Sequence, residues 1–214
     1  MRASFREQLD SVRGALVVMA ATVTSAITWA SAGLLEGDLP SAKQAIATAG
    51  EVDEGRREVE SRVHDLLARQ QPVAVDLRLT LVGLQVAGDL ARMGALAAHI
   101  AKIMVLSHPT PAVPPSAAEV IRSMARVAEQ LAWTMTRVLE VGDVAAARQL
   151  DRDDDEMDAL HVQLFEVLFQ DWTYGVKSAV DIALIGRFYE RYADHAVNAG
   201  RQVAFLVSGD DPNA

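Results

Sequence analysis

The sequence predicts an all-α protein built from two tandem, pseudo-repeated three-helix bundles. Three observations support this fold class. Residues that favour helices fill several long segments, and no segment shows the sustained alternation of polar and apolar residues that marks a strand. In addition, the chain contains an internal repeat of about 100 residues, which is too long for a solenoid unit and long enough to bury a core of its own.

The composition is consistent with this fold class. The chain has 214 residues, of which 50% are hydrophobic and only 5% aromatic. That length accommodates one large domain or two small ones, each with a buried core. Cysteine is absent, so the fold does not depend on disulfides, and we expect a reducing compartment.

Glycine and proline divide the first half of the chain into three long helical segments. Gly37 ends the first segment, and Asp38 caps the second, whose opening turn tolerates Pro40. Pro72 opens the third segment. We therefore expect the first three-helix bundle at residues 1–107.

A proline-rich linker is expected at residues 108–115, which contain four of the seven prolines of the chain. The tetrapeptide that begins at Ser116 reads as a capping box, so we expect the fourth helix to start there. Gly142 and Asp143 then repeat the stop-and-cap pattern before the fifth helix.

The loop between the fifth and sixth helices is expected at residues 171–175. The second bundle therefore covers residues 116–208, and Gly209 is the expected stop of the sixth helix. Residues 209–214 form a short tail.

The two halves are related in sequence. Residues 37–39 match residues 142–144, and residues 51–53 match residues 156–158, both at a separation of 105 positions. Farther along, Leu90 to Ala95 match Tyr189 to Asp194 at a separation of 99 positions. The smaller separation fits a shorter connection between the fifth and sixth helices, and the repeat predicts two similar bundles.

The charge of the chain excludes one class of function and leaves one helix open to interpretation. With 20 basic and 29 acidic residues, the net charge is −9, which repels phosphate backbones, so we expect no direct nucleic-acid binding.

Gly14 to Leu35 carry no charge, but several Ser and Thr residues dilute the run and the flanks mix both signs, so a signal peptide or membrane span is disfavoured. We expect a cytoplasmic protein whose first helix has an outer face available for a dimer, partner or membrane-surface contact.

Acidic residues crowd the fifth helical segment, where like charges four positions apart repel each other by about 0.2–0.5 kcal/mol per pair. Asp154, Asp158 and His161 lie on one stripe of that segment. Glu190, Asp194 and Asn198 lie on one stripe of the sixth segment. Such oxygen ligands with one imidazole favour Mg, Mn, Fe or Zn. The alternative is a solvated acidic face whose charge is neutralised by four arginines: Arg148, Arg152, Arg187 and Arg191.

Two segments resemble one known helical family. Gln70 to Arg78 read QQPVAVDLR, close to QQPVAxDLR at the junction of the second and third helices of the PhoU phosphate-signalling regulators. Tyr189 to Asn198 resemble the LERxxDHAxN segment of that family. The resemblance implies a homodimeric adaptor that represses the phosphate-starvation response and phosphate uptake. It implies two partners, a phosphate ABC transporter and the sensor histidine kinase of a two-component system.

The resemblance also implies a transition-metal site, because PhoU-like proteins carry E/D-x-x-x-D motifs that bind iron or other transition metals on paired helices of each bundle. Asp154 with Asp158, and Glu190 with Asp194, match both motifs of the second bundle, with His161 and Asn198 as secondary candidates. Three of the four matching positions in the first bundle are alanine: Ala49, Ala91 and Ala95, beside Asp53. We therefore expect Fe, Mn or Zn in the second bundle only.

Catalytic motifs are absent from the sequence. There is no G-x-x-x-x-G-K-[ST] loop, no G-x-G-x-x-G after a strand, no G-x-S-x-G and no cysteine nucleophile, so we expect no enzymatic function. Two alternatives from other classes remain open. One is a carboxylate-bridged metalloenzyme of ferritin-like type, which would need Glu-x-x-His motifs between four long helices. The other is a membrane-peripheral helical scaffold that uses the uncharged first helix.

Overall fold

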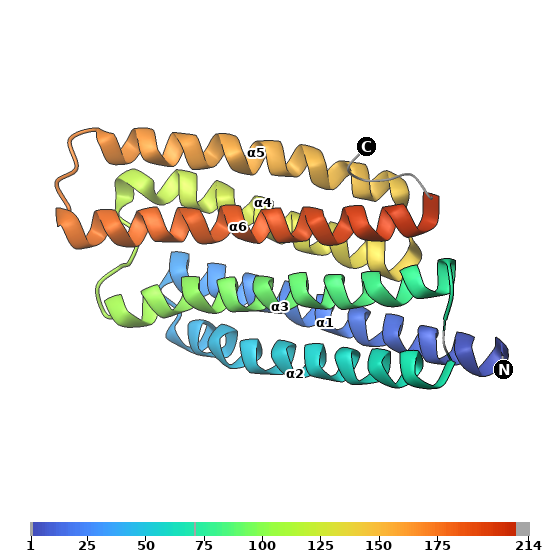
Figure 1. Cartoon of the computed structure of the whole chain (residues 1–214). Helices are drawn as coiled ribbons and strands as arrows, with labels where there is room; N and C mark the ends of the chain where they lie inside the picture. The colour runs from blue at the N-terminus through green and yellow to red at the C-terminus, as the bar shows by residue number, and fades with distance from the viewer. Residues whose placement is uncertain (1, 71, 209–214) are drawn as a thin grey trace.

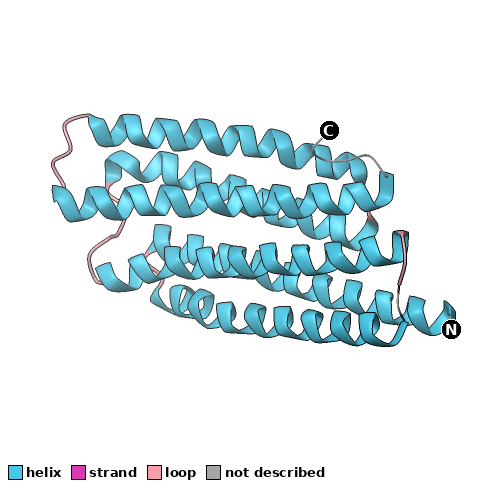
Figure 2. Cartoon of the chain, in the orientation of Figure 1, coloured by secondary structure: helices cyan, strands magenta, loops and turns pink. Residues whose placement is uncertain are grey.

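Six long helices form the protein in the computed structural model, which describes residues 2–70 and 72–208 (Figure 1). In chain order they are α1 (Arg2–Glu36), α2 (Leu39–Gln70), α3 (Val75–Ser107), α4 (Pro115–Val141), α5 (Val144–Phe169) and α6 (Gly175–Ser208). Short loops join them, and the described ranges contain no strand (Figure 2). The predicted all-α fold class is confirmed.

The stop-and-cap joints lie where the sequence predicts them. Gly37 and Gly142 have φ angles of +72° and +68°, which suit glycine because it has no Cβ. Asp143 caps α5, since one of its carboxylate oxygens accepts hydrogen bonds of 3.0 Å from the backbone N–H groups of both Ala145 and Ala146. Each joint therefore ends one helix and starts the next within two or three residues.

Two predicted helix starts are wrong. The residue that precedes α4 is Pro114, no side chain caps this end, and Pro115 occupies the first turn. Because the fixed φ of proline already starts the helix there, Ser116 is helical and cannot act as the cap, and the linker ends at residue 114. Likewise α3 begins at Val75, three residues after Pro72. The predicted stop at Gly209 and the tail at 209–214 lie outside the described residues.

The helices pack as two bundles of three. Helices α1, α2 and α3 contact one another, as do α4, α5 and α6, and the bundles meet where α1 packs on α4 and α3 packs on α6. Figure 1 shows the two groups one above the other, with α2 and α5 on the outside. Buried side chains of all six helices form one hydrophobic core, so the interface between the bundles is part of that core.

Polar contacts also join the bundles. The hydroxyls of Ser31 and Tyr189 are hydrogen-bonded at 2.9 Å in the buried region between α1 and α6. The hydroxyls of Thr24 and Thr136 are hydrogen-bonded at 3.1 Å between α1 and α4. Because buried polar groups need partners, these bonds favour one relative placement of the two bundles.

Two stretches, Phe5–Glu36 and Asp76–Ser107, are long and apolar enough to cross a membrane by length and composition. The most apolar windows of these stretches are 44% and 50% buried inside the fold. Core helices of globular proteins pass the same test, and so do signal sequences near an N-terminus. In this structure both stretches supply side chains to the shared core, as expected for a helical bundle.

Candidate metal centre on the second bundle

The four predicted metal ligands lie on neighbouring helices of the second bundle. Asp154 and Asp158 are one turn apart on α5, and Glu190 and Asp194 are one turn apart on α6, which packs against α5. Asp154 and Glu190 are partly buried, whereas Asp158 and Asp194 are exposed. The structure therefore gathers carboxylates from both helices at one seam.

Proton affinities show that these carboxylates interact. Burial, followed by the charges of Asp158 and Asp194, raises the pKa of Asp154 from 3.8 to about 6. Burial and the charge of Asp194 also raise the pKa of Glu190, although Arg187 opposes this rise. The negative charges at the seam exceed the nearby positive charge, so a further cation would be favourable there.

Arginine side chains compensate part of this charge. Arg187 donates a hydrogen bond to Glu190 Oε1, while Glu190 Oε2 is buried and has no hydrogen-bond partner in the described part of the chain. Arg201, which the sequence analysis did not single out, pairs with Asp151, with 2.6 Å between Nη2 and Oδ1. Of the four arginines considered from sequence, Arg152 instead donates to Gln149, and the side chain of Arg148 lies outside the described residues.

His161 lies on the same stripe of α5 as Asp154 and Asp158. Its Nε2 atom is buried and has no hydrogen-bond partner within residues 2–70 and 72–208, and its ring centroid lies 5.1 Å from that of Phe165. Burial, together with the charge of Arg187, lowers the pKa of His161. A lowered pKa favours the neutral imidazole, which has the free lone pair that metal ligation requires.

The side-chain types at this seam suit a metal ion, but their positions in the structure do not yet surround one. Among the described residues, Glu190 Oε2 and His161 Nε2 find no hydrogen-bond partner although both atoms are buried, and buried polar atoms are normally satisfied. As the side chains lie, however, no three His, Asp or Glu side chains among the described residues converge on one point. Binding would require the carboxylates to turn inward and Arg187 to release Glu190.

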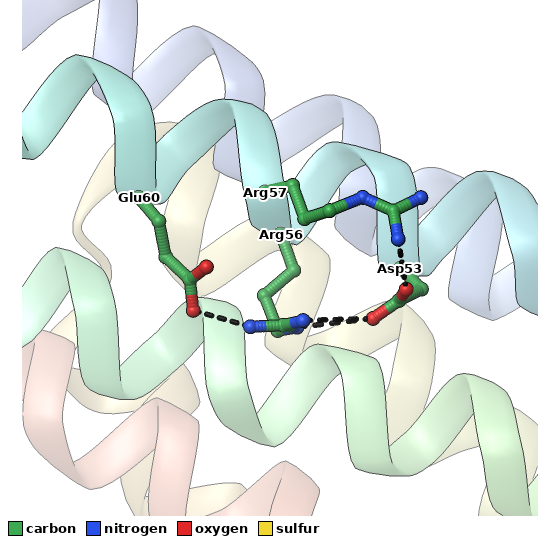
Figure 3. Close-up of polar contacts among 4 residues, drawn as sticks. All are labelled: Asp53, Arg56, Arg57 and Glu60. Atoms are coloured by element: carbon green, nitrogen blue, oxygen red, sulfur yellow. Dashed lines mark hydrogen bonds and ion pairs between the residues drawn. The ribbon is translucent and has the colours of Figure 1, made fainter.

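On the corresponding face of the first bundle, an arginine side chain provides positive charge. Arg56 pairs with Asp53, with 3.1 Å between Nη2 and Oδ1, and also with Glu60 (Figure 3). Arg57 binds the other oxygen of Asp53 at 2.9 Å. In the sequence repeat Arg56 matches His161, so a guanidinium lies where the second bundle has an imidazole. The hydrogen bond to Asp53 raises the pKa of Arg56, and its charge is permanent.

A polar cluster between the bundles was not predicted. Asp89 on α3 bonds to His195 Nδ1 at 2.9 Å and accepts a hydrogen bond of 2.7 Å from Asn198 Nδ2. Asn198 therefore contacts the first bundle, whereas the sequence analysis considered it as a ligand beside Asp194. Asp89 is more than 100 positions away from both residues, and no sequence spacing could have revealed the contact.

Comparison with known proteins identifies the family. The model of the PhoU domain matches residues 16–104 and 121–203, which include most of both bundles. The chain belongs to the PhoU family. Two similar relatives in Mycobacterium tuberculosis are named phosphate-specific transport system accessory protein PhoU homolog 1 and homolog 2. The first is 40% identical over 98% of this chain and 95% of that protein, and the second is 39% identical over 99% and 100%.

Solved PhoU structures have the same fold. The crystal structure of PhoU from Pseudomonas aeruginosa matches 96% of this chain and 100% of that chain, with a TM-score of 0.88 and 24% identity. The phosphate transport system regulatory protein PhoU from Streptococcus pneumoniae matches 97% and 98%, with a TM-score of 0.82 and 20% identity. The predicted family and the arrangement of two similar bundles are thus confirmed.

Both segments that suggested the PhoU family have defined places in the structure. In the first segment Gln70 ends α2 and Val75 begins α3, while Gln71 lies outside the described residues. Tyr189 to Asn198 lie within α6, where Tyr189 and Tyr192 are fully buried and Glu190 and Asp194 belong to the carboxylate seam. The second segment therefore combines core residues with candidate metal ligands on one helix.

Proposed function

We propose that this PhoU-family protein is a cytoplasmic negative regulator of the phosphate-starvation response and of phosphate uptake. It acts as a homodimeric adaptor between a phosphate ABC transporter and a two-component sensor kinase. The observation that carries the proposal is the 40% identity, over 98% of the chain, to a phosphate-specific transport system accessory protein.

Two further observations support an adaptor. The chain carries none of the catalytic motifs considered above, and its surface is mostly that of long helices, which recognise partner helices through grooves and faces. The net charge of −9 disfavours nucleic acid as the direct target of regulation. A regulator of this kind acts by contacting proteins.

The second bundle binds one transition-metal ion, Fe, Mn or Zn, in this proposal. Asp154 and Asp158 from α5 and Glu190 and Asp194 from α6 hold the ion, and His161 is placed to contribute its imidazole. When bound, the ion supplies positive charge that offsets the crowded carboxylates and joins two helices. In its absence Arg187 holds Glu190 and partly compensates the charge.

A clean deletion of the gene tests the regulatory role. Transcription of phosphate-acquisition genes should rise in phosphate-rich medium, and an intact copy of the gene should restore repression. Recovery of a transporter ATPase or a histidine kinase with the tagged protein would identify the contacted partner. Unchanged transcription and phosphate uptake in a strain that also lacks any paralogue would contradict the proposal.

A further inference from the structure

Large apolar side chains are exposed where α5 ends and α6 begins. Phe169 is 83% exposed and Val162 63% on α5, and Val176 is 81% exposed and Val180 50% on α6. A five-residue loop joins α5 and α6 at one end of the pair (Figure 1). Phe169 and Val176 are close to this loop in sequence, and Val162 and Val180 follow within two helical turns of them. The ring of Phe165 lies 5.9 Å from that of Phe169 and continues the surface along α5. We call these five residues the apolar end.

The apolar end continues into an acidic end on the same two helices. Along α5, the ring of His161 contacts that of Phe165, and Asp158 and Asp155 follow in the next turns. Asp194 belongs to the same acidic end on α6, and all three of these carboxylate residues are exposed. From Phe169 to Asp155 the surface is about 21 Å long, at 1.5 Å per helical residue. That length suits a partner helix of about four turns.

Charge decides among the possible occupants of this surface. An anionic membrane would attract apolar residues flanked mainly by Lys or Arg. On α5, however, residues 153–169 contain six carboxylates and no Lys or Arg. On α6, Lys177 and Arg187 are paired with Asp181 and Glu190, and Arg191 is exposed. A second copy of this chain would bring the same carboxylates and a net charge of −9. A helix with apolar residues at one end and Lys or Arg at the other complements both ends.

We propose that the outer face of α5 and α6 is a docking surface for a cationic amphipathic helix of a partner protein. The apolar end receives the apolar residues of that helix. In the metal-free protein Asp155, Asp158 and Asp194 attract its basic residues, so a metal ion held by Asp158 and Asp194 would compete with the helix. Clusters of exposed apolar residues commonly mark protein contacts, and complementary charge accelerates association and fixes register. This inference rests on the proposed function only for which partner protein is bound in the cell. The docking surface itself is inferred from exposed side chains and their charges, which do not depend on a role in phosphate regulation.

Binding of designed peptides tests the docking surface directly. The probes are two fluorescein-labelled helical peptides of 18 residues. One has Leu anchors in its N-terminal half and Lys in its C-terminal half, and the other has the reverse order. Fluorescence anisotropy is measured on the full-length protein in buffer with chelator. At least one peptide should bind, and a scrambled peptide of the same composition should bind at least tenfold more weakly.

Matched variants distinguish a direct role of the apolar end or the acidic end in peptide binding from a general effect of mutation. Phe169→Ser with Val176→Ser should weaken binding at least tenfold, while Val73→Ser with Val141→Ser, two residues 74% and 66% exposed elsewhere, should not change it. Asp158→Asn with Asp194→Asn should also weaken binding at least tenfold.

The charge control is Glu51→Gln with Glu54→Gln, which changes net charge equally on the first bundle and should leave peptide binding unchanged. The proposal is overturned if neither peptide binds, if the scrambled peptide binds equally, or if controls and test variants lose the same affinity. Equal or tighter binding to anionic lipid vesicles, lost in the same variants, would instead identify a membrane surface. A normal deletion phenotype with intact peptide binding would contradict the regulatory proposal alone.

Discussion

The negative charge of Asp154 is unfavourable in the folded protein. Its pKa is raised from 3.8 to about 6, so the folded chain binds this proton more tightly than the unfolded chain does. The charged form therefore destabilises the fold. This destabilisation is fully present above the folded pKa of about 6 and is relieved as the pH falls through that value toward 3.8.

The contribution of Asp154 to the free energy of unfolding of the metal-free protein should therefore rise as the pH is lowered from about 7.5 to about 5.5, whereas His161, whose pKa is lowered by burial, contributes with the opposite sign. Asp154→Asn should be more stable than wild type by about 1 kcal/mol at the upper pH, a value reduced for solvent screening of this partly exposed group. The difference in stability between the variant and wild type should shrink as the pH is lowered toward about 5.5. Urea unfolding with chelator measures both, and Asp155→Asn is the charge-matched control. Identical pH profiles for wild type and Asp154→Asn would rule out this account of the seam.

Arg56 and Arg57 provide a matched pair on the first bundle. Arg56 bridges Asp53 and Glu60, whereas Arg57 contacts Asp53 alone and is more exposed (Figure 3). At about 0.3–0.5 kcal/mol per helical ion pair, Arg56→Met should lower the free energy of unfolding by about 0.5–1 kcal/mol. Arg57→Met should cost less than about 0.5 kcal/mol. Equal losses in urea unfolding would mean that Arg56 does not act as the bridging cation.

Element boundaries depend mainly on local backbone chemistry. Gly37, Gly142 and Asp143 were predicted correctly because positive φ and side-chain capping are decided by one or two residues. Ser116 was assigned wrongly because two signals compete within two residues, and the proline before it starts the helix first. Sequence patterns thus predict the number and order of helices better than their exact starts.

The cap of α5 is the clearest test at the scale of one element. Asp143 accepts from two backbone N–H groups at 3.0 Å, so Asp143→Ala should lower the free energy of unfolding by about 1 kcal/mol. Asp143→Asn should retain most of that stability, because the amide oxygen can still accept. Urea or thermal unfolding distinguishes the two variants. A similar loss in both would point to the ion pair with Arg137, rather than to capping.

The relative placement of the two bundles was beyond sequence reasoning. The repeat predicts two similar units, but the contacts that join them connect residues far apart, such as Ser31 with Tyr189 and Asp89 with His195. No periodicity links such positions. The candidate ligands could be proposed because each pair lies at helical spacing, and Arg187 was among the four arginines considered from sequence. The involvement of Arg201 required knowledge of rotamers and of which helices face each other.

The two bundles thus have different side chains at matching positions. The second bundle has carboxylates beside the imidazole of His161, and the first has alanines and the guanidinium of Arg56. An ion held by one carboxylate, Asp53, would compete poorly with water and with Arg56 and Arg57, which already bind it. The central claim is therefore that metal binds to the second bundle alone.

Elemental analysis of purified protein, loaded separately with iron, manganese or zinc and then desalted, tests this claim most directly. Wild type should retain at least one of these metals, Asp158→Ala with Asp194→Ala should retain none, and Asp53→Ala should retain as much as wild type. Circular dichroism confirms that each variant is folded. Loss of metal in Asp53→Ala with retention in the double variant, or no retained metal in wild type, would contradict the account.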